Sequence, residues 1–178
     1  NRFLADEDEE IKGAALVSIA KETRDNLTLK KKYEIEHKIQ VRLDALATNQ
    51  NPESKKHRKL DLIKAIGYAN MPIFYPRLTT YLHSGDFEVL NHAIIAAGKT
   101  LSPVFIDDLI RLLAVKECKE NAMNALVHFD KNIVDFLKTN AEEGEVGLES
   151  LRVIPAVVKR IGAQRSIDFL FELFDYDD

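Results

Sequence analysis

The chain has 178 residues, of which 46% are hydrophobic, so it can bury a sizeable core. Its 25 basic and 29 acidic residues give a net charge of −4, and this total indicates no polyanionic partner. The single cysteine excludes an internal disulfide, and no apolar run approaches the roughly 20 residues of a membrane span, so we expect a cytoplasmic protein without direct membrane insertion.

The first predicted helix begins near Ile11 and runs to about Lys21. Acidic residues at positions 8–10 favour the positive end of this helix. Gly13 lies inside it, where a glycine costs about 1 kcal/mol relative to alanine.

A long helix over 26–47 is predicted next, because Ile35, Ile39, Leu43 and Leu46 recur at helical spacing. Its length implies an insertion or an irregular unit at this point of the chain. A polar loop then separates it from the following helix.

The helix after this loop carries clear start and stop signals. Asn51 is expected as its N-cap and Pro52 at its first position, where the missing amide hydrogen is not needed. Gly67 is expected to end it.

Two segments, 71–82 and 102–113, match each other in apolar spacing and begin with Pro72 and Pro103. We predict that each is the first helix of a helical hairpin. Proline at a helix start has no amide hydrogen that needs a partner.

The segment 89–98 is predicted to be the second helix of the hairpin that begins with 71–82. Val89, Ala93, Ala96 and Ala97 fall on one helical face, and the small alanines allow a partner helix to approach closely. Gly98 is expected to take the left-handed conformation that closes a helix.

The C-terminal part continues the same pattern. A helix over 118–127 begins at Cys118, which we interpret as a structural thiol. In a helix over 148–161, Pro155 lies near the middle and is expected to produce a kink. The remaining predicted elements are a short helix over 130–138, an acidic loop over 141–147 and a final helix over 166–173.

A pattern of ten residues recurs through these helices, with small or apolar residues at the fifth, eighth and ninth places and a helix-ending residue at the tenth. The starts of its copies lie 47, 31, 29 and 35 residues apart, which is typical of stacked helical hairpins. We therefore predict an all-α fold, an α-solenoid of about five hairpins that forms one domain over 1–178. The copies are 11–20, 58–67, 89–98, 118–127 and 153–162.

The repeat register predicts that both ends of the chain cut through a repeat, so that the chain is a fragment of a longer solenoid. End faces without polar caps favour self-association. The residues expected at these faces are Phe3, Leu4, Phe169, Phe171 and Phe174.

The stretch 8–20, with Asp, two residues, Ile, a basic residue and then small and apolar positions, resembles the HEAT repeat, especially its short bacterial variety. This resemblance implies a non-catalytic scaffold that binds a protein or peptide. The closing stretch 154–175 also resembles HEAT segments fused behind bacterial transporters similar to nucleotide antiporters. That second resemblance implies a cytoplasmic regulatory domain of a membrane protein.

Three classes of enzyme built on similar repeats provide alternatives. Enzymes that resemble deoxyhypusine hydroxylase hold iron with His-Glu pairs, and no histidine of this chain precedes a glutamate. Alkylpurine glycosylases use tryptophan, which is absent here. Phycobilisome lyases offer no short motif to test, so a lyase-like subunit that binds a small molecule stays open as the alternative function.

No motif for a metal, a nucleophile or a phosphate loop is present, so we predict no cofactor, no metal and no catalytic residue. A weaker nucleic-acid alternative depends on the basic stretches 30–32 and 55–59.

What remains is a binding surface. In HEAT-like stacks the second helices line the concave side, and the register places the third, fourth and seventh motif positions there. Their mixture of amides, charges and one exposed isoleucine suits an extended peptide or a helix, although a solvated surface is the equal alternative. The candidate residues are Leu60, Asp61, Lys64, Asn91, His92, Ile95, Glu120, Asn121, Asn124 and Lys159.

Overall fold

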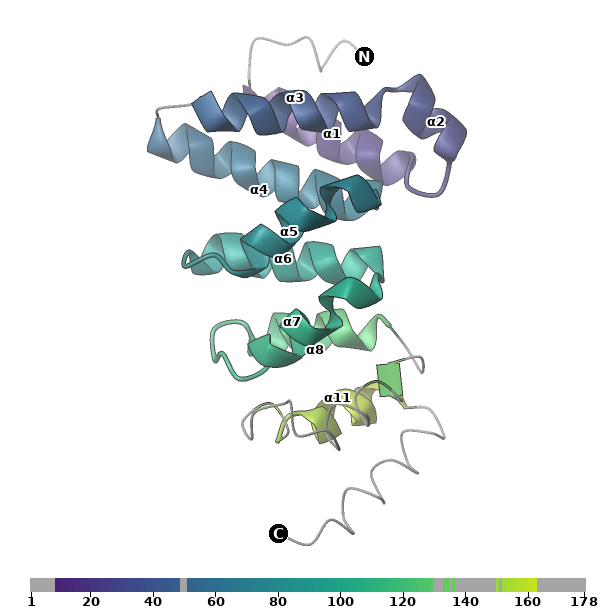
Figure 1. The fold of residues 1–178 in the computed structure, drawn as a ribbon, viewed down its shortest axis with the longest axis vertical. Helices are drawn as coiled ribbons and strands as arrows, with labels where there is room; N and C mark the ends of the chain where they lie inside the picture. The colour runs from purple at the N-terminus through teal and green to yellow at the C-terminus, as the bar shows by residue number, and fades with distance from the viewer. Residues whose placement is uncertain are drawn as a thin grey trace, which may run out of the picture. The chain divides into compact units, whose positions relative to one another are not determined.

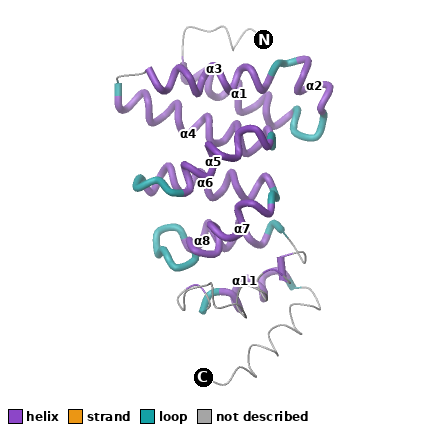
Figure 2. Tube along the Cα trace, in the orientation of Figure 1, coloured by secondary structure: helices purple, strands orange, loops and turns teal. Residues whose placement is uncertain are grey.

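The computed structural model describes residues 9–48, 51–129, 133–134, 136, 150 and 152–162. Within this part of the chain all elements are helical and no strand occurs, which confirms the all-α prediction (Figures 1 and 2). Several predicted features lie outside the described residues: the acidic loop over 141–147, the final helix over 166–173, most of the short helix over 130–138 and all five end-face residues.

The chain divides into two compact units, unit 1 (Asn1–Thr100) and unit 2 (Leu101–Asp178). The prediction of a single domain stays a prediction. In unit 1, α4 packs against both α1 and α6, while α3 contacts α1 and α4, and α5 contacts α6. The elements of unit 1 are α1 (Glu9–Glu22), α2 (Leu27–Lys32), α3 (Ile35–Thr48), α4 (Pro52–Ala69), the 3-10 turn η2 (Pro72–Phe74), α5 (Tyr75–Leu82) and α6 (Phe87–Thr100).

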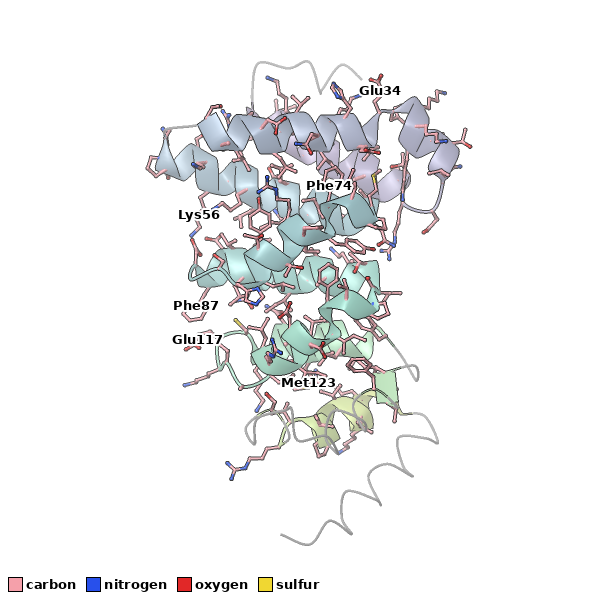
Figure 3. The ribbon with its side chains drawn as sticks, viewed as in Figure 1. Glu34, Lys56, Phe74, Phe87, Glu117 and Met123 are labelled. Carbon is pink, nitrogen blue, oxygen red and sulfur yellow. The ribbon has the colours of Figure 1, made fainter. Side chains whose placement is uncertain are left out.

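Helices α1, α4 and α6 run in the same direction, because contacts join their corresponding ends. Near the start of α4, Lys56 reaches Asp86 at the start of α6 (Figure 3). Near the end of α4, the Tyr68 ring lies beneath the ammonium group of Lys99. Just after α1, the Arg24 guanidinium donates a hydrogen bond to the carbonyl oxygen of Lys99 and so satisfies a carbonyl in the last turn of α6.

Gly67 does not end its helix. A Cβ atom there would lie 2.7 Å from both the Cα and the Cβ of Ala96, so glycine allows α4 and α6 to come into backbone contact. Helix α4 continues to Ala69, and Asn70, with a φ of 49°, closes it. The prediction was wrong because close packing, and not helix termination, requires the missing side chain.

The prediction for Gly98 was also wrong. Helix α6 continues to Thr100, and Leu101 takes the left-handed conformation with a φ of 54°. The predicted glycine ends a helix only at Gly162, with a φ of 68°. A glycine at the tenth motif place therefore allows close helix packing at Gly67 and ends a helix at Gly162.

The predicted long helix over 26–47 is broken. Helix α2 ends at Lys32, and Glu34 takes a left-handed φ of 52° before α3 begins (Figure 3). No residue of α2 is buried, whereas Ile35, Ile39 and Leu46 of α3 are. The buried apolar face therefore begins only at Ile35. No buried side chain of α2 holds that helix collinear with α3.

The two segments predicted as matching first helices, 71–82 and 102–113, do share one local structure. Each begins with a 3-10 turn that carries proline at its start, followed by an α-helix. The corresponding apolar side chains Phe74, Leu78 and Leu82 in one, and Phe105, Leu109 and Leu113 in the other, are all buried.

In unit 2, α8 packs against both α7 and α11. Pro155 lies in the first turn of α11, so the predicted kink is wrong. The helix begins at Ile154, which places proline where no amide hydrogen is missed. The elements of unit 2 are η3 (Pro103–Phe105), α7 (Ile106–Leu112), α8 (Lys119–Val127) and α11 (Ile154–Ile161).

The Gly67→Ala substitution should lower the free energy of unfolding by about 1–3 kcal/mol, because the new methyl group meets the backbone of Ala96. Gly13→Ala is the matched control. There the obstructing group is the Asp61 carboxylate, which can rotate away, so the change should stay within about 1 kcal/mol. Urea denaturation measures both, and equal effects would contradict the close-contact interpretation.

Leu101→Gly should be more stable than Leu101→Ala by about 1 kcal/mol. Both variants remove the half-exposed side chain, but only glycine relieves the left-handed strain. Thermal unfolding of the pair measures the difference. If alanine proves the more stable residue, as it is in ordinary helical backbone, the conformation assigned to Leu101 is wrong.

Candidate functional site

Unit 1 contains six of the ten predicted surface residues, and four of them are exposed or partly exposed on α4 and α6 as predicted. Ile95 of α6 has 42% of its surface exposed. Lys64, Asn91 and His92 are partly exposed and each contacts its own helix. The Lys64 ammonium lies 3.3 Å from a carboxylate oxygen of Asp61. The Asn91 amide and the His92 Nδ1 atom each lie 2.9 Å from a carbonyl oxygen one turn earlier.

Leu60 and Asp61, also predicted for the binding surface, instead take part in packing within unit 1. Leu60 is only 8% exposed, because an aliphatic side chain at this motif position turns into the packed side of α4. The Asp61 carboxylate lies against Gly13 of α1, so it takes part in the contact between the two helices.

The other four predicted residues belong to unit 2, where two of them share one partner. The Arg160 guanidinium of α11 donates hydrogen bonds to Glu120 at 3.0 Å and to Asn124 at 2.8 Å, both on α8. Glu120 and Asn124 thus connect α8 to α11. Asn121 is partly exposed, and Lys159 is exposed.

Sequence reasoning missed Arg160, although a signal was present. Arg160 occupies the eighth place of its motif copy, where the other copies carry serine or alanine. An arginine at a position that normally packs small side chains indicates a specific partner. Because its side chain is 45% exposed, the ion pair with Glu120 contributes at most about 1 kcal/mol.

A cationic and aromatic cluster lies at the C-terminal ends of α1, α4 and α6. The Lys99 ammonium is 3.9 Å from the centre of the Tyr68 ring, a distance suited to a cation–π contact. A hydrogen bond with Lys99, the charge of Lys99 and, more weakly, the charges of Lys21 and Arg24 hold the pKa of Tyr68 below its ordinary value. Lys99, Lys21 and Arg24 therefore bring positive charge to this end of unit 1.

At the opposite ends of α4 and α6, charges are paired. The Lys56 ammonium lies 2.9 Å from Asp86 and 2.7 Å from Glu88. Hydrogen bonds to Glu88 and Asp86 raise the pKa of Lys56, and Lys56 in turn lowers the pKa of both carboxyls. One cation of the basic stretch 55–59 is therefore already neutralised, which weakens the nucleic-acid alternative.

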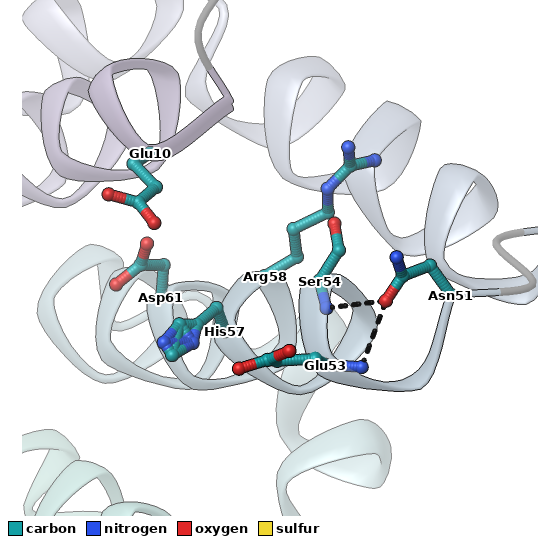
Figure 4. A pocket seen from close by; sticks show the side chains of 7 residues that line it. All are labelled: Glu10, Asn51, Glu53, Ser54, His57, Arg58 and Asp61. Carbon is teal, nitrogen blue, oxygen red and sulfur yellow. Dashed lines mark hydrogen bonds between the residues drawn. The ribbon is translucent and has the colours of Figure 1, made fainter.

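A pocket of about 280 Å³ opens at the start of α4 (Figure 4). The side-chain Oδ1 atom of Asn51 accepts hydrogen bonds from the backbone amides of Glu53 and Ser54, each at 3.1 Å, so the helix terminus is capped by the protein itself. The carboxylates of Glu10 and Asp61 point toward one another across the pocket. In the described residues no group of three histidine, cysteine or acidic side chains could hold a metal ion.

A larger groove, of about 550 Å³, is bounded by α2, the start of α3 and the turn η2. Its apolar lining consists of Leu27, Ile35, Met71, Ile73 and Phe74. The sequence pattern predicted an insertion at this point of the chain but no groove, because the groove depends on the break between α2 and α3.

No protein-family model matches the chain, and no curated protein matches it. Among the helices that the structure describes, none is both long enough and apolar enough to cross a membrane.

Cys118 is fully buried, and burial, followed by the charge of Glu117, raises the pKa of its thiol. A raised pKa reduces the reactive thiolate fraction, in accord with a structural thiol.

We expect alkylation of Cys118 by iodoacetamide at pH 8 to be at least about tenfold slower in the folded than in the urea-unfolded protein, since it requires local opening. A Ser18→Cys variant supplies the exposed reference thiol, and mass spectrometry separates the two sites. Reaction of folded Cys118 as fast as the reference would contradict its assignment as a buried structural thiol.

Proposed function

We propose that the chain is a non-catalytic scaffold that binds a protein partner, built as a HEAT-like α-solenoid. The parallel packing of α1, α4 and α6, with α3 and α5 as first helices of the following hairpins, supports this proposal. The matched starts of α5 and α7 support it further, because a repeat array reuses one local structure.

The observation that carries the proposal is the exposed row on α4 and α6. Ile95 is 42% exposed, Lys99 follows it one turn later, and the Tyr68 ring lies beneath the Lys99 ammonium. The Ile95 and Tyr68 side chains supply apolar and aromatic area suited to a protein interface, and the Lys99 ammonium adds a charge that can orient a partner. Lys64 and His92 extend the row with polar groups.

The resemblance to transporter-fused segments adds a location to the proposal, the cytoplasmic side of a membrane transporter. The parental open reading frame tests this part independently. Membrane spans encoded upstream would support it, and flanking repeats without spans would contradict it and leave the scaffold alone.

A photoreactive benzoylphenylalanine at position 95 should crosslink to discrete partners in cells, because an interface there brings partner atoms within reach of the probe. Position 41 on α3 is the control, since Val41 is similarly exposed, at 50%, and lies on a different helix. Adducts are detected by gel shift and mass spectrometry. Identical adducts from both positions, or none from position 95, would contradict the assignment of this row as the binding surface.

A further inference from the structure

The groove beside α2 exists because of an insertion. After α4 and after α6, only residues 70–71 and 101–102 separate the second helix from the turn that starts the next hairpin. After α1, residues 23–34 intervene and form α2. This extra helix makes one wall of the groove, so the groove depends on a segment that lies outside the ten-residue motif.

The groove has an apolar floor and two exposed aliphatic walls. Ile35 and Phe74 are buried at its floor, with 0% and 2% of their surface exposed. Leu27 on α2 is 66% exposed, and Ile73 in η2 is 62% exposed. A hollow of about 550 Å³ with this lining can take large apolar side chains, and covering the two walls would remove unfavourable apolar surface from water.

The α2 side of the groove is cationic, whereas the two carboxylates that line the groove, Glu34 and Glu36, lie after α2 and on α3. Lys30 and Lys31 line it, and within the described part of the chain neither has a carboxylate at ion-pair distance. Glu34, at the end of this wall, is paired with Lys38 at 3.4 Å. Burial lowers the pKa of Lys30 more than the charge of Asp25 raises it, so its ammonium has lost hydration that a carboxylate would replace.

We infer that this groove binds a short acidic amphipathic segment of a partner protein, with apolar side chains between Leu27 and Ile73 and a carboxylate at Lys30 and Lys31. The groove is open to solvent, with both aliphatic walls more than half exposed, whereas sites for small molecules enclose most of the ligand surface. Different elements form the row around Ile95, so either surface can fail without the other.

Selection of random peptides of about 12 residues on the full chain tests the inference. Selected sequences should combine aspartate or glutamate with neighbouring leucine, isoleucine or phenylalanine. Leu27→Ser and Ile73→Ser should each weaken the best peptide at least about tenfold by fluorescence polarisation, because they remove apolar contacts. Val104→Ser is the matched control, since Val104 is 60% exposed and follows proline at the same place of the next hairpin.

Charge reversal supplies the second readout. Lys30→Glu together with Lys31→Glu should weaken acidic peptides and strengthen versions in which the acidic residues are replaced by lysine. Weaker binding of the acidic peptides and stronger binding of the lysine versions would each support the proposed binding mode of the groove. Failure to select any peptide, equal loss in the Ile73 and Val104 variants, or selection of peptides without acidic residues would overturn the inference. Binding of decanoate with the same dependence on Leu27 and Ile73, without peptide binding, would assign the groove to an acyl carboxylate instead.

Discussion

The backbone contact between α4 and α6 is the constraint on which the rest of unit 1 depends. Helix α4 lies between α1 and α6, and the absence of a side chain at Gly67 lets it meet Ala96 closely. At that separation the helix starts are joined by the ion pairs of Lys56, and the helix ends by Tyr68 and Lys99. A larger residue at position 67 would move both sets of contacts, since packed interiors tolerate little added volume.

Helix ends determine where the surfaces of unit 1 lie. Asn70 and Leu101 take left-handed conformations and lead into turns that begin with proline. The chain reverses after α4 with only two connecting residues, and the connection after α6 has the same length. Between α1 and α3 the reversal is longer and includes a third left-handed residue, Glu34. The turns leave Ile73 and Val104 exposed at equivalent places, and α2 forms a second wall beside Ile73.

The candidate surface was predictable in part. The motif register placed Ile95 at the surface, because its motif position lies on the water-facing side of an amphipathic helix whatever residue occupies it. It placed Leu60 wrongly, since small rotations of a helix decide whether a border residue is covered. It could not name Arg160 as the partner of Glu120 and Asn124, because that pairing joins residues about 40 positions apart.

The sequence by itself determined the helical class, the caps at Asn51 and Pro52, and the matched buried positions of the two proline-led helices. Each of these depends on neighbours within a few residues, where periodicity and capping chemistry act. Tertiary structure decided the role of Gly67, the break at Glu34 and the groove beside α2. Local preferences permit several conformations for a glycine or for a lysine-rich turn, and the helices packed around that segment select one of them.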